Sequence, residues 1–338
     1  MIEVSVIIPC RNEEKFIGKC LDSLIKQDYQ KDILEVLIID GDSEDETKNI
    51  VEKYSKKHLF IKLLDNPNKY TPFGLNIGIK AATGEIIVRM DAHAGYNSDY
   101  LSKCVKNLRE SGADNVGGVI KTLPSKNTVW SKSIASVLSN RFGAGFSYFR
   151  IGSDKPRWVD TVFGGCYKKS IFEKIGMFNE KLIRGQDIEL NKRLKEAGGK
   201  ILLAPDIIAT YFPQSTFFGF LKHNFIDGYW TIYPLKFNIK LFSSRHLIPL
   251  FFFLALFGGF LLSLVFGFGK ILFFSISAIY VLANLFFSLE IIVKNESENL
   301  LSLMITFFNR HFFYGLGSFW GIIILLINKY GRKKTKRN

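Results

Sequence analysis

Long uncharged apolar runs in the last third of the chain constrain its fold more than any other feature. Residues 247–267 contain no charged side chain, and about 20 apolar residues are enough to cross the hydrocarbon core of a membrane. A second run covers 271–293 and is interrupted by Glu290, and a third, shorter run covers 312–328. The sequence therefore predicts a soluble region followed by membrane-spanning helices. Arg310-His311 could mark a re-entrant piece, or a break between two crossings within 300–328.

Basic side chains gather beside these apolar runs. The formal net charge of the chain is +14. Some of the basic residues precede the first run and others form the tail: Lys236, Lys240 and Arg245, then Arg332, Lys333, Lys334, Lys336 and Arg337. Basic residues next to spans favour the cytoplasmic side and attract anionic lipid head groups. Because the clusters adjoin the spans and no nucleic-acid motif is present, we expect membrane lipids and no nucleic acid as partners.

The N-terminus and the cysteines favour a cytoplasmic soluble region. Met1-Ile2-Glu3 leads directly into a predicted strand and does not resemble a cleavable signal. The four cysteines have no metal-ligand spacing, and a cytosolic domain keeps such thiols reduced. We therefore expect a multi-pass protein of the cytoplasmic membrane whose soluble region lies in the cytoplasm.

Strand and helix patterns alternate in the first part of the chain. Short apolar segments indicate buried strands at residues 4–9, 34–39, 60–64 and 85–90. Helical periodicity separates them at residues 12–27, 47–57 and 71–82. Such alternation predicts parallel βαβ units and a doubly wound α/β sheet. Further along, residues 121–150 are expected to be rich in loops, followed by a helix at 188–197 and a strand at 200–204.

A carboxylate and an imidazole follow the fourth predicted strand. Asp91 and His93 are two positions apart, so on an extended chain their side chains project the same way. In an open α/β sheet, ligands bind at the carboxyl ends of the strands. The pair therefore indicates the start of a divalent-metal site, and a solvated turn is the alternative.

The ends of the first two predicted strands carry further polar groups. Asp40 is placed to accept hydrogen bonds from a base edge or a ribose hydroxyl, and Ser43 or Asp45 to cap the next helix; a capped loop with no other role is the alternative. Arg11 is suited to stack on a base or pair with a phosphate. Glu13 is suited to complement a helix N-terminus.

Asp187 is a candidate general base. It lies in the first turn of a predicted helix, where the helix dipole favours the ionised carboxylate that could accept a proton from a hydroxyl. An ordinary first-turn aspartate is the alternative, and Glu189 is the second candidate. Ser-His-Asp, Cys-His, Walker and Gly-x-Gly-x-x-Gly patterns are missing, which argues against hydrolases, nucleotide triphosphatases and dinucleotide-binding oxidoreductases.

Taken in order, these motifs resemble family 2 of the inverting glycosyltransferases, which have the GT-A fold. The resemblance covers about residues 4–205. Five segments match in sequence order: the opening strand with its Asn-Glu motif at 4–13, the acidic nucleotide loop at 40–47, a Leu-Asn-x-Gly helix containing Asn76, Asp91-Ala92-His93 in place of Asp-x-Asp, and Gln186-Asp187 in place of Glu-Asp. Residues 89–94 and 311–317 are similar to a subgroup like the succinoglycan-biosynthesis glycosyltransferases, which are membrane-attached enzymes of exopolysaccharide assembly.

The chain departs from the family pattern at three places. His93 replaces the second Asp of Asp-x-Asp, and a neutral imidazole leans toward Mn²⁺ as the ion. Gln186 replaces Glu beside the base. The Gln-x-x-Arg-Trp motif of processive synthases is missing, which favours transfer of one sugar.

The resemblance implies a domain order and a set of site residues. The expected parts are a mostly parallel, doubly wound GT-A catalytic domain at 1–215, an amphipathic or interfacial linker at 216–246, a transmembrane region of two to four spans at 247–330 and a basic tail at 331–338. The implied nucleotide-sugar ligands are Pro9, Arg11, Glu13, Asp40, Asn76 and Asp91. Asp91 and His93 would hold Mn²⁺ or Mg²⁺, Asp187 would be the base, and Gly164, Gly165 and Gln186 would contact the sugar or acceptor.

The implied activity is that of a metal-dependent inverting glycosyltransferase. It would move one sugar from a nucleotide-sugar donor, a UDP-sugar, to a lipid-linked saccharide acceptor at the cytoplasmic face of the membrane, in exopolysaccharide or cell-surface glycan synthesis. Two alternatives stay open. One is a polyprenyl-phosphate sugar synthase of the same fold, and the other is a non-catalytic membrane scaffold.

Overall fold

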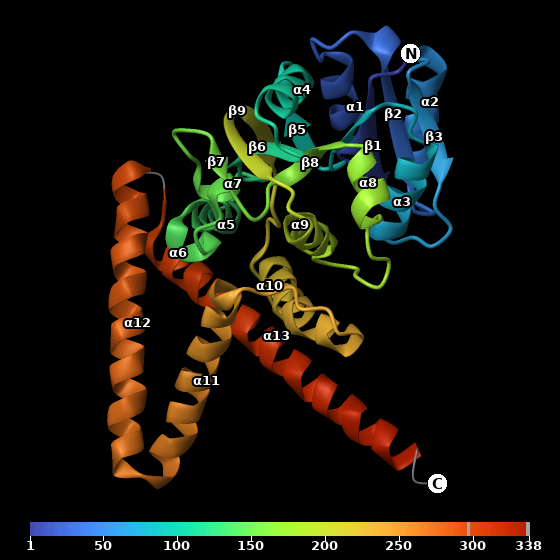
Figure 1. Ribbon diagram of the computed structural model, residues 1–338. Coiled ribbons are helices and arrows are strands. Elements are labelled where there is room, and N and C mark those ends of the chain that lie inside the picture. Colours follow the sequence, from blue (N-terminus) through green and yellow to red (C-terminus); the bar gives the residue numbers. More distant parts are fainter. Residues whose placement is uncertain (296–297, 336–338) are drawn as a thin grey trace. The chain divides into compact units, whose positions relative to one another are not determined.

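The computed structural model describes residues 1–295 and 298–335, with side chains up to residue 328. The chain divides into two compact units. The first consists of residues 1–121 and 148–211, and it contains the β-sheet. The second consists of residues 122–147 and the chain from residue 212, and it contains the long C-terminal helices (Figure 1).

Four parallel strands form one half of the sheet. They are β1 (Val4–Cys10), β2 (Leu34–Asp40), β3 (Ile61–Asp65) and β4 (Ile86–Arg89), in the spatial order β3-β2-β1-β4. The chain moves outward from β1 to β2 and β3, and then returns to place β4 on the other side of β1. Such a reversal of direction creates a crevice at the carboxyl ends of the strands, which is the usual ligand site in α/β sheets.

The other half of the sheet is antiparallel where its pairing is resolved. It continues from β4 through β8 (Phe163–Lys168), β6 (Asn115–Thr122), β9 (Ile201–Tyr211) and β5 (Ala94–Tyr96), and β7 (Arg157–Trp158) pairs with β9. The predicted α/β class is confirmed, as a mixed sheet.

Helices cover both faces of the sheet. Alternate residues of β1 show why: Val6 and Ile8 belong to one buried cluster, and Ile7 belongs to another. The first cluster includes side chains of α1 (Ile17–Ile25), α2 (Thr47–Lys57) and α4 (Tyr100–Glu110). The second includes side chains of α3 (Thr71–Ala81), α8 (Ser170–Ile175) and α9 (Gln186–Glu196). Two short elements complete the unit, η1 (Lys31–Ile33) and α7 (Tyr148–Ile151).

The first helix begins later than predicted. The sequence pattern placed it at 12–27, but α1 covers Ile17–Ile25. The backbone N–H groups of Asn12, Glu13 and Glu14 donate to side chains of the loop after β2. Because that loop is distant in sequence, helical periodicity alone could not show that the start of the segment is held out of the helix.

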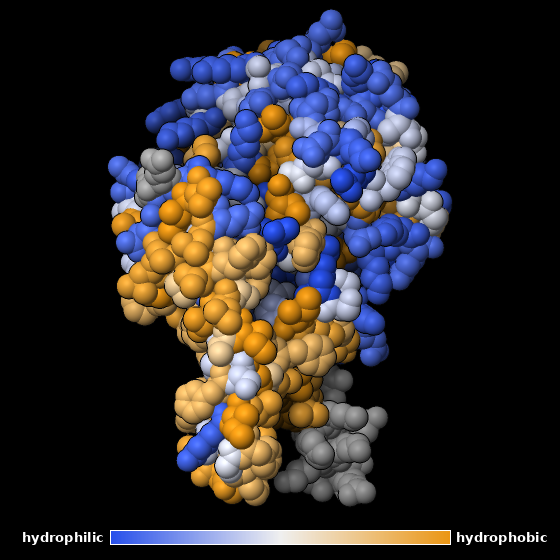
Figure 2. Space-filling model, turned by 90° about the vertical axis from the view of Figure 1, so that its left-hand side faces the viewer, coloured by the Kyte–Doolittle hydropathy of each residue, from blue (hydrophilic) through white to orange (hydrophobic). Residues whose placement is uncertain are grey.

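The second unit is helical. Its elements are α5 (Val129–Ser139), α6 (Arg141–Ala144), α10 (Phe217–Ile232), η2 (Tyr233–Phe237), α11 (Ser244–Val265), α12 (Gly267–Lys294) and α13 (Leu300–Thr335). Among the described residues, three helices are long and apolar enough to cross a membrane, at Ser244–Val265, Gly267–Lys294 and Leu300–Asn328. Figure 2 shows apolar side chains along the surface of α12. The number of candidate spans lies within the predicted two to four.

The predicted break at Arg310-His311 is wrong, because α13 passes through both residues as one helix. Arg310 donates to Asn224 Oδ1 at 2.6 Å and to the Gly143 carbonyl at 3.3 Å. His311 is hydrogen-bonded to the Phe142 carbonyl at 3.0 Å. Neighbouring helices of the same unit therefore satisfy these polar groups, and the helix does not need to end there.

The predicted loop region at 121–150 is also wrong in part, because α5 and α6 lie within it. Val137 of α5 packs against Leu303 and Phe307 of α13. Residues 122–147, which we predicted to belong to the catalytic domain, thus pack within the second unit. The boundaries at 215, 246 and 330 stay predictions. Of the predicted basic tail, residues 336–338 lie outside the described residues.

Candidate functional site

A cleft of about 230 Å³ opens at the carboxyl ends of the parallel strands in the first unit. The ends of three strands and the segments after them line the cleft. The end of β1 and its loop contribute Pro9, Cys10, Arg11 and Glu13, and the end of β4 and the following turn contribute Arg89, Asp91, Ala92 and His93. The rest of the lining is Ile39 of β2, Asn66, Lys69 and Thr71 between the end of β3 and the start of α3, and Gln186 at the start of α9. Of the predicted site residues, the fold brings Pro9, Arg11, Glu13, Asp91, His93 and Gln186 together here.

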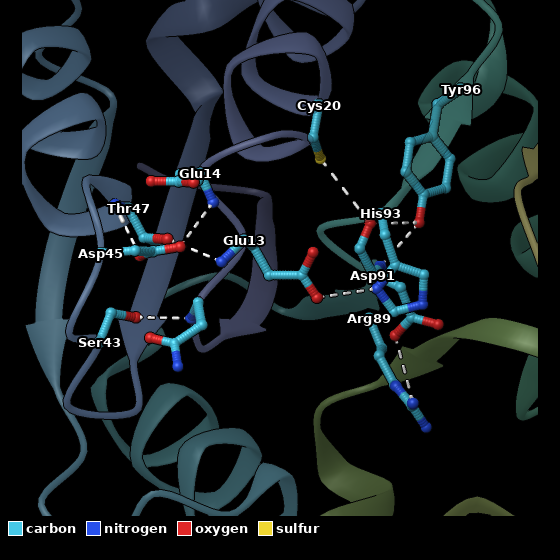
Figure 3. A network of polar contacts seen from close by, with 11 residues as sticks. Glu13, Glu14, Cys20, Ser43, Asp45, Thr47, Arg89, Asp91, His93 and Tyr96 are labelled. Atoms are coloured by element: carbon cyan, nitrogen blue, oxygen red, sulfur yellow. Dashed lines mark hydrogen bonds and ion pairs between the residues drawn. The ribbon is translucent and has the colours of Figure 1, made fainter. Parts of the chain in front are cut away.

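The loops after β1 and β2, residues 11–16 and 41–46, are joined by hydrogen bonds, and we call them the interlocked loops (Figure 3). The N–H of Asn12 donates to Ser43 Oγ at 2.9 Å, and the N–H of Glu44 donates back to Asn12 Oδ1 at 2.9 Å. The N–H of Glu13 donates to Oγ1 of Thr47, the first residue of α2, at 2.7 Å. These bonds fix the backbone of one side of the cleft before any ligand binds.

Asp40, the last residue of β2, supports the loop that follows that strand. Its side chain is buried, and Oδ2 accepts the N–H of Ser43 at 3.1 Å, while Oδ1 is buried without a partner among the described residues. Asp40 is not one of the residues that line the cleft. Of the two predicted caps, Asp45 accepts the N–H of Thr47 at 3.0 Å, whereas Ser43 bonds to Asn12 instead.

Asp91 and His93 lie in the turn between β4 and β5 and face the cleft. Asp91 Oδ1 accepts Nη2 of Arg89 at 3.3 Å, and the Asp91 N–H donates to the hydroxyl of Tyr96 at 2.7 Å. His93 Nδ1 lies 3.1 Å from Glu13 Oε1 (Figure 3). The predicted pair is therefore close to two further ionisable groups, Arg89 and Glu13.

The charge state of His93 follows from these neighbours. Burial lowers the pKa of the imidazole, but the hydrogen bond with Glu13 and the charge of Asp91 outweigh burial, so the pKa of His93 lies above its ordinary value. A metal ligand must be neutral imidazole, so this proton competes with any metal ion.

The side chains fit a metal ion that is shared with a substrate. Within the part of the chain whose side chains are described, no group of three or more His, Cys, Asp and Glu residues is placed to hold an ion. Asp91 and His93 supply two donors on one wall of the cleft. Ions of the Mg²⁺ type often take one or two protein ligands and complete their shell with substrate phosphates and water. The donor set therefore suits a phosphate-bridged ion and not a closed protein cage.

Arg89 is the site residue that sequence reasoning missed most clearly. It is 8% exposed, ends β4 and lines the cleft. Burial lowers the pKa of its guanidinium, but the charges of Asp91 and Asp187 raise the pKa above its ordinary value, so the group stays charged. In the sequence, Arg89 is a basic residue at the end of an apolar strand, and this pattern alone does not indicate ligand binding. Asn66, Lys69 and Thr71 were missed too, because only the fold brings the β3–α3 loop and the start of α3 to the cleft.

Gln186 and Asp187 begin α9, as predicted. Gln186 is buried and lines the cleft. The Asp187 side chain accepts the N–H of Ile188 at 2.9 Å, and its charge acts on Arg89. Asp187 is not one of the residues that line the cleft, so its role as base stays a prediction.

Asn76 is not one of the residues that line the cleft, and its predicted contact with the nucleotide sugar stays a prediction. Its amide donates to the Phe178 carbonyl and to Glu180 Oε1, both at 2.9 Å, and its oxygen accepts the Phe178 N–H at 2.9 Å. The side chain is thus fully used in holding the segment between α8 and α9.

The glycine pair Gly164-Gly165 has left-handed backbone angles, with φ of 68° and 121°. A Cβ at Gly164 would lie 2.8 Å from the Arg89 carbonyl, so a side chain there would push β8 away from β4. The pair therefore allows two strands to approach each other. Its predicted contact with sugar or acceptor stays a prediction.

Comparison with known proteins identifies the family. The family model described as glycosyl transferase family 2 matches residues 5–176. The chain belongs to glycosyl transferase family 2. It is 31% identical to the dolichyl N-acetyl-alpha-D-glucosaminyl phosphate 3-beta-D-2,3-diacetamido-2,3-dideoxy-beta-D-glucuronosyltransferase of Methanococcus voltae. The alignment of 327 residues covers 95% of this chain and 97% of that protein. The chain is thus a nucleotide-sugar glycosyltransferase of family 2.

Two further relatives extend the comparison. Glycosyltransferase AglE of Haloferax volcanii is 29% identical, over 67% of this chain and 71% of that protein. Succinoglycan biosynthesis protein ExoA of Rhizobium meliloti is 26% identical, over 68% of this chain and 74% of that protein. The resemblance to glycosyltransferases of the succinoglycan type is confirmed.

Two solved structures share the fold of this family 2 enzyme. The mannosyltransferase PcManGT from Pyrobaculum calidifontis, in complex with GDP-Man and Mn²⁺, has a TM-score of 0.59 at 20% identity, over 95% of this chain and 87% of that chain. Staphylococcus aureus TarS 1-349 in complex with UDP-GlcNAc has a TM-score of 0.52 at 18% identity, over 94% and 90%. At these identities the likeness supports the GT-A-type fold alone.

Proposed function

We propose that this glycosyltransferase moves one sugar, with inversion, from a UDP-sugar to a lipid-linked saccharide. One observation supports the proposal most: Asp91, His93 and Gln186 converge on one cleft, and the described part of the chain also contains three helices long and apolar enough to cross a membrane. The cleft suits a water-soluble donor, and the apolar helices would hold the enzyme at the membrane where a lipid-borne acceptor lies.

The interlocked loops are the proposed site for the base and ribose. Their backbone is fixed by internal hydrogen bonds, and Arg11 and Lys69 add two cations at this part of the cleft. Asp40 would act here through the loop that it supports. We choose UDP because the motifs resemble UDP-sugar enzymes and because a structure of the same fold holds UDP-GlcNAc. The mannosyltransferase of the same fold holds GDP-Man, so GDP-sugars belong in the test.

Asp91 and His93 are the proposed ligands of Mn²⁺ or Mg²⁺. The mannosyltransferase structure contains Mn²⁺ with its donor. When bound, such an ion neutralises the charge that develops on the leaving diphosphate. Glu13 would then accept a hydrogen bond from Nδ1 of His93 and orient the ring, since its carboxylate already lies 3.1 Å from Nδ1.

Asp187 is the proposed general base. Its carboxylate lies at the N-terminus of α9, where the helix dipole favours the ionised form. It would take the proton of the acceptor hydroxyl while that oxygen attacks the anomeric carbon. The bond between that carbon and the diphosphate oxygen breaks on the opposite face, which inverts the anomeric configuration.

A lipid-linked saccharide is the proposed acceptor. The name of the relative from Methanococcus voltae gives a dolichyl-linked sugar phosphate as its acceptor and a glucuronosyl group as the sugar it transfers. We propose a comparable acceptor at the cytoplasmic leaflet, since Lys236 and Lys240 precede the first candidate span and Arg245 lies in its first turn. The product would enter an exopolysaccharide or another cell-surface glycan.

The test is a transfer assay with the purified full-length protein in lipid nanodiscs. A panel of radiolabelled UDP- and GDP-sugars is offered with Mn²⁺ and either a polyprenyl-linked saccharide or polyprenyl phosphate. We expect label in the lipid fraction with the saccharide acceptor, and mild acid should release it as part of a larger saccharide. Release of labelled monosaccharide from polyprenyl phosphate would replace this proposal by the lipid-phosphate reaction. Transfer from no donor would contradict both.

A further inference from the structure

Arg89 is a charged group of the cleft that the proposed reaction does not use. Its side chain is 10% exposed, whereas the side chains of Arg11 and Lys69 are 37% and 39% exposed. Burying a charge costs free energy unless hydrogen bonds and opposite charges compensate it. The hydrogen bonds of Arg89 are therefore informative.

Most of the hydrogen-bonding capacity of Arg89 is unused. Nη2 lies 3.3 Å from Asp91 Oδ1, which is longer than the roughly 2.7–2.9 Å of a good charge-assisted bond (Figure 3). Nε and Nη1 are buried and have no partner among the described residues. A buried donor without an acceptor is rare in folded proteins and needs an explanation.

Nearby carboxylates do not supply that explanation. Asp91 has one oxygen already in contact with Nη2 and is the proposed metal ligand. Asp187 acts on Arg89 by its charge, and its Oδ1 accepts the backbone N–H of Ile188 at 2.9 Å. Neither removes the need for acceptor oxygens at Nε and Nη1.

The position of Arg89 indicates what could supply them. It ends β4 and lies two residues before Asp91, which is the proposed diphosphate end of the site, and it faces the same cleft as Gln186, which precedes the proposed base. In the proposed reaction, the bond between the sugar and the diphosphate must lie between these two places. A planar guanidinium pairs best with the oxygens of a phosphate or a carboxylate.

We propose that Arg89 binds an anionic oxygen group at the sugar end of the donor, either the β-phosphate of the nucleoside diphosphate or a carboxylate on the transferred sugar. The inference rests on the proposed function, because it assumes that a nucleotide sugar occupies the cleft. Binding brings acceptor oxygens to the guanidinium and so removes the cost of its unmade hydrogen bonds. Arg89 is thereby a determinant of donor affinity that acts by direct contact.

The experiment is isothermal titration calorimetry of the full-length protein in detergent with Mn²⁺. The ligands are UMP, UDP, UDP-glucose and UDP-glucuronate, and the proteins are wild type, Arg89→Gln and Arg89→Lys. Arg109→Gln is the matched control, since Arg109 is 63% exposed, pairs with Glu3 and is not among the residues of the cleft. The melting temperature of each variant is measured alongside.

If the anion is a phosphate, Arg89→Gln weakens UDP about ten-fold or more and UMP less than about two-fold. If the anion is a sugar carboxylate, only UDP-glucuronate loses about ten-fold. Either pattern supports the proposal, and Arg89→Lys should fall between wild type and Arg89→Gln because it keeps charge without the planar fork. Should Arg89→Gln fail to fold, the same comparison is decided with Arg89→Lys.

Unchanged affinity for all four ligands, or an equal loss for all four including UMP, would overturn the role of Arg89 while leaving the proposed function intact. Failure of the wild-type protein to bind any of them would overturn the proposed function and this inference together.

Discussion

The two walls of the cleft are built in opposite ways. The interlocked loops satisfy many of their own polar groups, since each loop donates N–H groups to side chains of the other. In the β4 wall, which we define as residues 89–93, the Asp91 carboxylate has one long contact with Arg89, and two nitrogens of Arg89 have no partner among the described residues. The first wall is thus pre-organised, and the second is completed by a ligand. Affinity for the base and ribose should depend mainly on the first wall. Affinity for the diphosphate end of the donor and the rate of transfer should depend mainly on the second.

Asp187→Asn should have the largest effect on the transfer rate, because it removes the proposed general base. We expect the transfer rate to fall by about 10³-fold, within the usual range for loss of a general base. Affinity for UDP should stay within about two-fold of wild type, since no nucleotide contact is lost. Radiolabel transfer and calorimetry measure the two quantities. Glu196→Gln on the same helix, paired with Lys192, is the control and should be normal in both. Near-normal transfer by Asp187→Asn would remove Asp187 from the mechanism.

Removal of the metal ion should have the second-largest effect on the transfer rate. Excess EDTA should lower transfer by about 10²-fold or more, because several kcal/mol of charge stabilisation is lost. Asp91→Asn should cause a similar loss that added Mn²⁺ does not restore. UMP binding should change little, since the interlocked loops hold the base and ribose. Full activity in EDTA would show that the β4 wall does not act through an ion.

The interlocked loops can be loosened at Thr47, which is fully buried and accepts the Glu13 N–H at 2.7 Å. Thr47→Val removes the acceptor and leaves a buried N–H without a partner, which costs about 1–3 kcal/mol of stability. We expect the affinity for UMP to fall several-fold with a smaller change in the rate at saturating donor. Thr47→Ser keeps the oxygen and should restore both. A variant that lowers only the saturated rate would contradict the division of roles between the walls.

Glu35 is the centre of a buried hydrogen-bond network outside the cleft, and its substitution should have the smallest effect on activity. It is 1% exposed and accepts Ser5 Oγ at 2.7 Å and the Thr83 N–H at 2.6 Å. Burial alone would raise the pKa of Glu35, but these bonds and Lys62 lower it to about 2, against an ordinary value of 4.5. A depressed pKa stabilises the fold above pH 4.5, and that contribution, about 3 kcal/mol, is lost as the pH falls toward 2.

Thermal unfolding at pH 7 and at pH 3 measures this effect. Glu35→Gln should lower the melting temperature at pH 7, and the difference from wild type should shrink at pH 3. Glu52→Gln, on the exposed face of α2, should change neither. A constant difference at both pH values would show that the ionised carboxylate is not what stabilises this part of the sheet. Transfer activity at pH 7 and low temperature should stay close to wild type.

The sequence predicted the parts of the site that follow directly from strand order. Asp91 and His93 come after an apolar strand, and Gln186-Asp187 opens a helix, so local patterns were enough to place them. Arg89 was missed because its meaning depends on burial and on unmade hydrogen bonds, which no pattern shows. The resemblance implied a nucleotide contact for Asn76, which stays a prediction, and no local pattern could show that its amide bonds to the segment at 178–180.

Long-range packing explains the other errors. The start of α1 is shifted by hydrogen bonds to a loop about 30 residues away. Helix α5 forms in a stretch predicted to be loops because Val137 packs against α13, more than 150 residues later. Local periodicity contains neither kind of information.

A structure of the protein with a non-hydrolysable UDP-sugar and Mn²⁺ tests the central claim most directly. The account predicts the uracil and ribose against the interlocked loops, the ion between Asp91, His93 and the diphosphate, and the anomeric carbon between Arg89 and Asp187. A nucleotide bound elsewhere, or one whose sugar points away from Arg89 and Asp187, would contradict it.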